Sequence, residues 1–283
     1  MSPTSPLITL REAAEHLGVH YMTAYRYVRT GRLRATRDGV QWMVDPRDLA
    51  SLHTPTPAGR ARGTAGAARP PELAARMVAG DEAGAWGVVE AALGSGVEPA
   101  GIHLDLVVPA LESIGDDWAS GTLSVADEHR ATAVAQRLIG RLGPRFARRG
   151  RKRGSVVIGA PSGELHSLPT AIVGDLLRGA GFEVLDMGAN APAESFAETA
   201  RAATRLVAVA LAVTGPGHDA AVRSTIRKLR QADITAPVLV GGGAVTSEDH
   251  ARRLGADGWS GRDGHEVLAA LEVVARGAVN RQG

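Results

Sequence analysis

From Gly154 onward the chain alternates short apolar runs with amphipathic stretches, and this alternation limits the fold more than any other feature. The strand candidates are SVVIGAP, FEVLDMGAN, LVAVALAVTG, APVLVGGG and ADGWSG. Between them lie TAIVGDLLRGAG, PAESFAETARAA, HDAAVRSTIRKLRQ and SEDHARRLG, which are predicted helices. This pattern predicts a doubly wound parallel sheet with helices on both faces. Ligands bind such sheets at the carboxyl ends of the strands, so we expect a site in the loops after GAP, MGAN, VTGPG and GGG.

Three segments precede this sheet domain, and they predict a multidomain chain of α and α/β parts. Residues 1–54 form a compact patterned unit, and residues 55–71 form a linker rich in Pro, Gly, Ala and Arg. Residues 72–150 carry only helical signals, including Ser124 as a helix N-cap, and predict a four-helix bundle. The sheet domain occupies residues 154–283.

Composition narrows the classes of protein that the chain can belong to. The chain has 283 residues, 44% of them apolar, which indicates a folded protein of two or three domains. The absence of cysteine excludes disulfides and thiolate metal sites. No signal peptide or transmembrane stretch is recognisable, so we expect a cytoplasmic protein without membrane contacts. The basic run RFARRGRKR, residues 145–153, lies between two patterned regions, which favours a solvated linker over a phosphate contact.

The compact unit at residues 1–54 has the pattern of a winged helix-turn-helix DNA-binding domain. Its first helix, REAAEHLG, ends at Gly18, and the second, HYMTAYRYVRTG, is predicted to enter the major groove. An arginine-rich hairpin around Asp38-Gly39 follows as the wing. The predicted DNA contacts combine base-reading and phosphate-binding side chains: His20, Tyr21, Thr23, Arg26, Arg29, Arg34 and Arg37. The segment resembles the excisionase and MerR-type families; a small helical protein-interaction domain is the alternative.

The loop after the first strand of the sheet carries a candidate metal ligand. In APSGELHSLPTAIV, Glu164, His166 and Pro169 form the pattern E-x-H-x-x-P. Glu164 can accept the proton on one imidazole nitrogen, which fixes the tautomer of His166 and makes its other nitrogen a better ligand. Further loops at the same sheet edge contain Thr214 and a glycine run whose missing side chains leave a slot for a long ligand tail. An ordinary tight turn or a dinucleotide loop is the alternative for that run.

This motif set resembles the cobalamin-binding domain of methionine synthase and corrinoid proteins, with Glu164, Pro169 and Thr214 in place of the family's Asp, Gly and Ser. The resemblance implies that His166 is the lower axial ligand of cobalt. It also implies contacts to the nucleotide tail from Ser167, Thr214, Gly215, Gly241, Gly242 and Gly243. In the bundle, Trp118 precedes Glu128-His129 in the pattern W-x9-E-H. Combined with the helix-turn-helix, this pattern resembles the CarH and LitR light-dependent repressors over nearly the whole chain.

Membership of that family implies a non-enzymatic transcriptional repressor that binds operator DNA. Trp118, Glu128 and His129 would then line the upper face of the corrin and hold the upper group of adenosylcobalamin; methylcobalamin and hydroxocobalamin are alternatives. In the family, the cobalamin-bound dark form is a homo-oligomer, typically a tetramer, whose several DNA-binding units raise affinity. Light breaks the Co–C bond, the oligomer dissociates and DNA is released. Without the resemblance, Trp118 would be assigned to the core and Glu128-His129 to a solvated helix start.

One position departs from the family pattern. The residue after the Trp, a His in the family that becomes the second axial ligand after photolysis, is Ala119 here. A methyl group cannot coordinate cobalt, so His129, His103 or water would have to take its place, or the upper group leaves without replacement. Two other functions also fit the sequence: a light-independent sensor of cobalamin level or redox state, and a corrinoid methyl carrier, against which the helix-turn-helix argues.

Overall fold

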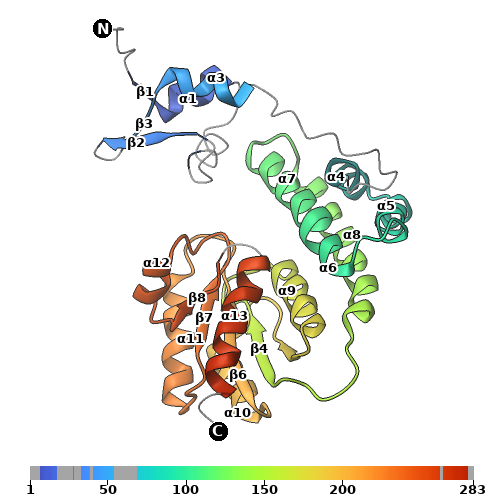
Figure 1. Cartoon of the computed structure of the whole chain (residues 1–283), viewed down its shortest axis with the longest axis vertical. Helices are drawn as coiled ribbons and strands as arrows, with labels where there is room; N and C mark the ends of the chain where they lie inside the picture. The colour runs from blue at the N-terminus through green and yellow to red at the C-terminus, as the bar shows by residue number, and fades with distance from the viewer. Residues whose placement is uncertain are drawn as a thin grey trace. The chain divides into compact units, whose positions relative to one another are not determined.

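The computed structural model falls into two compact units, Met1–Ala65 and Gly66–Gly283 (Figure 1). It describes residues 7–17, 28, 33–38, 41–53, 69–261 and 264–279. The boundary between the units falls within the predicted linker, residues 55–71. The bundle and the sheet domain, which the sequence divides into separate domains, belong to the same unit. No described helix has the length and apolar character that are needed to cross a bilayer.

The described residues of the N-terminal unit form two helices and a small antiparallel sheet. Its elements are β1 (Ile8–Thr9), α1 (Leu10–Leu17), β2 (Ala35–Asp38), β3 (Gln41–Val44) and α3 (Pro46–His53). The strands are ordered β1-β3-β2, and Asp38 pairs with Gln41, so the predicted hairpin connects β2 to β3. Leu10, Leu33 and Val44 form its core, because their side chains come together from α1, the segment before β2, and β3. The structure adds α3 and β1, which the sequence did not predict.

The second unit begins with the helical bundle. Its elements are α4 (Pro70–Ala79), α5 (Glu82–Gly94), α6 (Pro99–Gly101), the π-helix η1 (Ile102–Val107), α7 (Val108–Ala119), α8 (Val125–Leu142) and the 3-10 turn η2 (Gly143–Phe146). The predicted first helix is broken in two because Gly80 adopts a φ of 72° and the Asp81 side chain accepts a hydrogen bond from the Gly84 amide to cap α5. Ser124 caps α8 as predicted, in a reciprocal capping box with Asp127.

The sheet domain confirms the predicted alternation of strands and helices. Its elements are β4 (Ser155–Gly159), α9 (Leu168–Gly179), β5 (Glu183–Asp186), α10 (Ala193–Ala202), β6 (Leu206–Ala212), α11 (Asp219–Gln231), β7 (Val238–Gly241), α12 (Glu248–Arg253), β8 (Gly258–Trp259) and α13 (Gly264–Val279). All its strand pairs are parallel, in the order β5-β4-β6-β7-β8. The order reverses between β4 and β6, which is where such sheets bind ligands. The last helix, α13, was not predicted.

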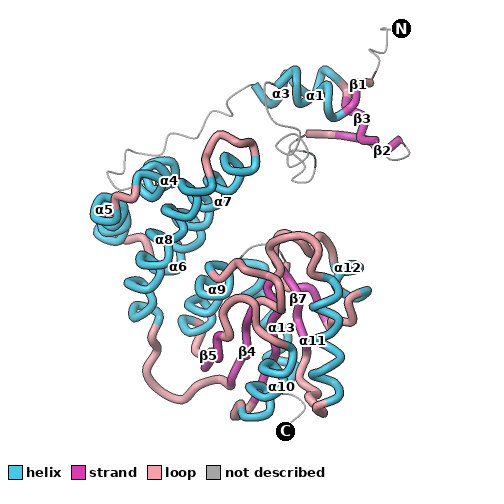
Figure 2. Tube along the Cα trace, turned by 180° about the vertical axis from the view of Figure 1, so that it is seen from behind, coloured by secondary structure: helices cyan, strands magenta, loops and turns pink. Residues whose placement is uncertain are grey.

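Helices lie on both faces of the sheet (Figure 2). Alternate residues of the strands pack under these helices on opposite faces. Val157 and Val209 face α10 and α11, whereas Val156 and Ala208 face α9 and α13. This doubly covered arrangement explains why the strand sequences are continuously apolar rather than alternating.

The bundle and the sheet domain share a hydrophobic core. Ile172 and Leu176 of α9 belong to the same buried cluster as the bundle residues Leu106 and Leu138. A second contact is polar: the fully buried His103 of η1 places Nε2 3.1 Å from Asp175 Oδ2 of α9, and its ring stacks on Phe146 at 4.9 Å. The helix that follows the candidate ligand His166 is therefore attached to the bundle.

Candidate functional site

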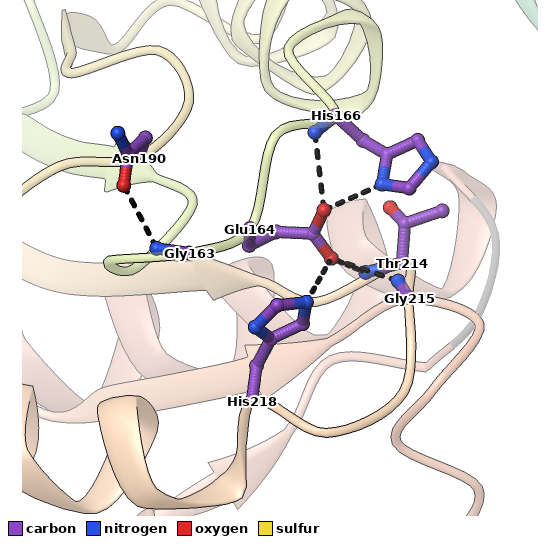
Figure 3. A network of polar contacts seen from close by, with 7 residues as sticks. All are labelled: Gly163, Glu164, His166, Asn190, Thr214, Gly215 and His218. Atoms are coloured by element: carbon purple, nitrogen blue, oxygen red, sulfur yellow. Dashed lines mark hydrogen bonds and ion pairs between the residues drawn. The ribbon is translucent and has the colours of Figure 1, made fainter.

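The site is organised around Glu164, a carboxylate buried at the point where the strand order reverses (Figure 3). Glu164 lies in the loop after β4, and Thr214 and Gly215 lie in the loop after β6. One carboxylate oxygen accepts hydrogen bonds from the backbone amides of Thr214 at 2.7 Å and Gly215 at 2.8 Å. The other accepts from the backbone amide of His166 at 3.0 Å and contacts its ring nitrogen Nδ1. Four donors thus converge on one buried side chain.

These contacts determine the charge of Glu164. Burial alone would raise the pKa of its carboxyl group, but the hydrogen bonds from Gly215, His166 and Thr214 together lower that pKa below its ordinary value. Glu164 is therefore a carboxylate, not a carboxylic acid, at neutral pH. A carboxylate can only accept hydrogen bonds, so His166 Nδ1 is the donor and carries a proton.

The imidazole of His166 fits the role of a cobalt ligand. Because Nδ1 donates to Glu164, the lone pair of the neutral ring resides on Nε2. The side chain is 57% exposed, so this nitrogen is accessible, and a carboxylate on the far nitrogen is the usual support of a metal-ligating histidine. His166 lies just before α9 in the chain, and the next residue, Ser167, is the N-cap of that helix. The donor set present in the chain therefore fits the coordination that the sequence predicts.

The structure adds His218, which was not predicted from the sequence. His218 is the N-cap residue of α11, and its Nε2 lies 4.0 Å from Glu164 Oε2 (Figure 3). Gly215 lies between the two imidazoles: a Cβ there would be in van der Waals contact with both, 3.6 Å from His166 Cε1 and from His218 Nε2. The sequence signal that could have identified His218 is its position in the loop after β6, at the predicted ligand-binding edge of the sheet.

The glycine run after β7 is explained first by packing. A Cβ at Gly241 would lie 2.2 Å from Ser260 Oγ, and one at Gly242, where φ is 104°, would lie 2.5 Å from the Val213 carbonyl oxygen. Both positions therefore exclude side chains whether or not a ligand binds. A Cβ at Gly243 would lie 3.4 Å from the carbonyl oxygen of Thr214. The tail-binding role of these three glycines stays a prediction.

The bundle residues of the predicted upper face lie on its surface. Trp118, near the end of α7, is 49% exposed, so its assignment to the hydrophobic core is wrong. Glu128 and His129 occupy the first turn of α8, where His129 Nδ1 lies 2.9 Å from Glu128 Oε2. The other oxygen of Glu128 accepts a hydrogen bond from Thr132, and the His129 side chain is 75% exposed. The large exposed aromatic side chain and the exposed imidazole are each available to a ligand.

The structure corrects one candidate for the second axial ligand. His103 is fully buried, its Nε2 is bound to Asp175, and its Nδ1 is enclosed without a hydrogen-bond partner in the described part of the chain. It is therefore unavailable to cobalt. Ala119 is the last residue of α7, next to Trp118. Of the histidines considered, His129 alone is exposed enough to serve.

A pocket of about 310 Å³ lies between α8 and the beginning of α9. Gln136 and Gly140 line it from the bundle, and Ser167, Thr170 and Asp175 line it from α9. The predicted tail contact Ser167 therefore faces open space where the bundle meets the sheet domain.

The predicted DNA contacts are only partly covered by the described residues. His20, Tyr21, Thr23, Arg26 and Arg29 lie outside them. Arg34 is exposed just before β2, and the backbone of Arg37 lies within β2. Arg37 thus belongs to the hairpin and Arg34 directly precedes it, and their contact with DNA stays a prediction.

Family models match three parts of the chain. Residues 7–52 match a helix-turn-helix domain, and residues 71–142 and 154–272 match two models that are each described as a B12 binding domain.

The chain is also similar to curated relatives and to a solved structure that are named corrinoid proteins. Trimethylamine corrinoid protein 2 of Methanosarcina acetivorans is 31% identical over 202 residues, which cover 68% of this chain and 91% of that protein. A corrinoid protein of Desulfitobacterium hafniense is 27% identical over 60% of this chain and 81% of its own length. The structure of Methanosarcina barkeri monomethylamine corrinoid protein matches 71% of this chain and 96% of its own with a TM-score of 0.61 and 17% identity, which supports the fold.

Proposed function

The chain belongs to the family of cobalamin-binding corrinoid proteins, and we propose that it is a transcription regulator whose DNA binding is controlled by its cobalamin. The observation that carries the proposal is the combination in one chain of a helix-turn-helix domain with two B12 binding domains. A carrier that only passes methyl groups between proteins has no use for DNA contacts, whereas a regulator needs both parts.

Each part of the cofactor has a candidate partner in this chain. His166 would hold the cobalt through Nε2, and Glu164 keeps the ring in the required tautomer through Nδ1. The Thr214 and Gly215 amides orient Glu164 in turn. The bundle residues proposed to contact the upper group are the exposed Trp118 and His129 and the half-buried Glu128. When bound, adenosylcobalamin supplies a cobalt–carbon bond that light can break.

The finer proposal is that this regulator responds to light as a homo-oligomeric repressor. Protein loaded with adenosylcobalamin in the dark is expected to elute from a sizing column as an oligomer and to bind its operator. Green light should change its absorption spectrum and reduce its apparent mass, because the bundle no longer holds the upper group. Absorbance and size-exclusion chromatography before and after illumination test this. Protein loaded with hydroxocobalamin is the control, which light should leave unchanged. Identical dark and lit profiles would overturn the light response and leave the cofactor site intact.

The DNA-binding part is tested by the salt dependence of duplex binding. Replacing Arg26 and Arg29 together by alanine should weaken binding and flatten the plot of log affinity against log salt, by about 0.9 for each phosphate that is no longer neutralised. Fluorescence anisotropy with a labelled duplex measures it. Arg223→Ala with Arg227→Ala, two arginines of α11 in the sheet domain, is the matched control. A slope unchanged by the Arg26 and Arg29 substitutions would contradict their phosphate role.

A second candidate function has a specific observation in its favour. The relative with 31% identity is named a trimethylamine corrinoid protein, and the chain spans 91% of it. A methyl carrier would accept a methyl group on its cobalamin from a methyltransferase partner. Its affinity for duplex DNA would not depend on Arg26 and Arg29. Duplex binding that depends on Arg26 and Arg29 therefore separates the two functions.

A further inference from the structure

The segment that connects the bundle to the sheet domain, residues 145–153, carries six cations and no acid, and we call it the basic loop. Its arginines differ in their contacts. Arg153 pairs with Glu272 of α13, and Lys152 Nζ donates to the Arg148 carbonyl at 2.8 Å. Among the described residues, the exposed side chains of the remaining four form no hydrogen bond or ion pair: Arg145, Arg148, Arg149 and Arg151.

The basic loop is not a free tether, because its C-terminal half is bonded to the sheet domain. The guanidinium group of Arg205 donates to the carbonyls of Lys152 at 3.1 Å and Arg153 at 3.0 Å. The Arg153 amide also donates to the Gly181 carbonyl at 3.0 Å. The Lys152 side chain then closes the turn back onto Arg148. The backbone at this end of the loop is therefore already ordered in the folded chain, which lowers the entropic cost of binding a partner next to it.

Structural reasons account for only some of these cations. Arg145 follows the C-terminal end of α8, where a positive charge is favourable next to the helix dipole. Arg153 holds α13 through Glu272. Arg148, Arg149 and Arg151 have no such reason, and they repel one another without an acidic side chain in the loop to compensate. Exposed guanidinium groups match the oxygens of phosphate groups, and a polyanion would relieve the repulsion.

We propose that the basic loop is a second DNA-binding surface, which contacts the phosphate backbone through Arg148, Arg149 and Arg151 without reading sequence. The proposal rests on the proposed function, because the helix-turn-helix match at residues 7–52 is what favours DNA over other polyanions. The second surface would add electrostatic affinity to each chain and would be carried by the unit that holds the cofactor.

The test compares the full chain with a variant that carries Arg148→Gln, Arg149→Gln and Arg151→Gln. Its matched control carries Arg227→Gln, Arg252→Gln and Arg253→Gln, three exposed arginines of α11 and α12 whose replacement changes the net charge equally. Binding to a labelled duplex of mixed sequence is measured over a series of sodium chloride concentrations. The loop variant is expected to lower the salt slope by up to about 2.7, or about 0.9 per phosphate, and the control should retain the wild-type slope.

Three results would overturn the proposal. A loop variant with the wild-type slope shows that the basic loop does not contact DNA, and an equal decrease in both variants shows a general charge effect. Absence of duplex binding by the wild-type chain would overturn the proposed function as well, which distinguishes the two failures. An absorbance titration with hydroxocobalamin verifies folding, since the substituted arginines lie outside the Glu164 and His166 network and the cobalamin spectrum should not change.

Discussion

Replacing His166 by alanine is expected to remove the protein nitrogen from the lower face of bound cobalamin and to change its absorption spectrum. Nε2 is the free nitrogen of an exposed ring whose other nitrogen is bound to a buried carboxylate, so its loss removes the supported imidazole from the loop after β4. Replacing Glu164 by glutamine should weaken cobalamin binding by about 10-fold to 100-fold. The amide N–H group of glutamine cannot accept the hydrogen bonds that the Thr214 and Gly215 backbone amides donate to the carboxylate.

Electron paramagnetic resonance gives a direct measurement of this ligand. In the cob(II)alamin state, one axial nitrogen splits the cobalt signal into triplets, and protein labelled with the heavy nitrogen isotope should convert these to doublets only where His166 is present. His250→Ala is the matched control, since His250 contacts Asp219 on α11, apart from this network. Labelled wild-type protein that retains triplets would show that the cofactor keeps its own base, and His166 would not be the ligand.

Replacing Asp175 by alanine is expected to reduce the free energy of unfolding by about 1–3 kcal/mol, which is the usual cost of leaving a buried polar group without its partner. Asp175 accepts from His103 Nε2 at 3.1 Å and from Arg178 at 3.0 Å. Without it, His103 keeps both ring nitrogens enclosed and unpaired, since Nδ1 already has no partner among the described residues. The attachment of the bundle to α9 should therefore weaken.

A double-mutant cycle separates the pair from its surroundings. His103→Phe retains a ring that can stack on Phe146 and removes the polar atoms. If the two side chains act together, His103→Phe with Asp175→Ala should cost less than the sum of the single changes, by about 0.5–3 kcal/mol. Urea unfolding followed by circular dichroism measures this. Asp249→Ala, at a carboxylate that is 80% exposed, is the control and should change stability by less than about 1 kcal/mol. Additive effects would contradict the pairing.

The fold of the sheet domain could be predicted because its signals are local. Apolar runs such as SVVIG and LVAVALA are too short for helices and too continuous for a half-exposed sheet, so their alternation with amphipathic stretches predicts buried parallel strands. The break at Gly80, the π-helix around His103 and the terminal helix α13 were not predicted. These features depend on what each segment packs against, and periodicity does not report that.

The order of residues along the chain is enough to place His166 and Glu164 in the loop after the first strand, two residues apart, with the chemistry of a supported imidazole ligand. Which nitrogen is free follows from the three-dimensional arrangement, because it depends on a carboxylate that is kept charged by amides from a loop fifty residues further along the chain. The same arrangement brings His218 to that carboxylate and buries His103 against α9. Contacts between segments distant in sequence depend on how strands and helices are ordered in space, and that order is set by packing rather than by any local pattern.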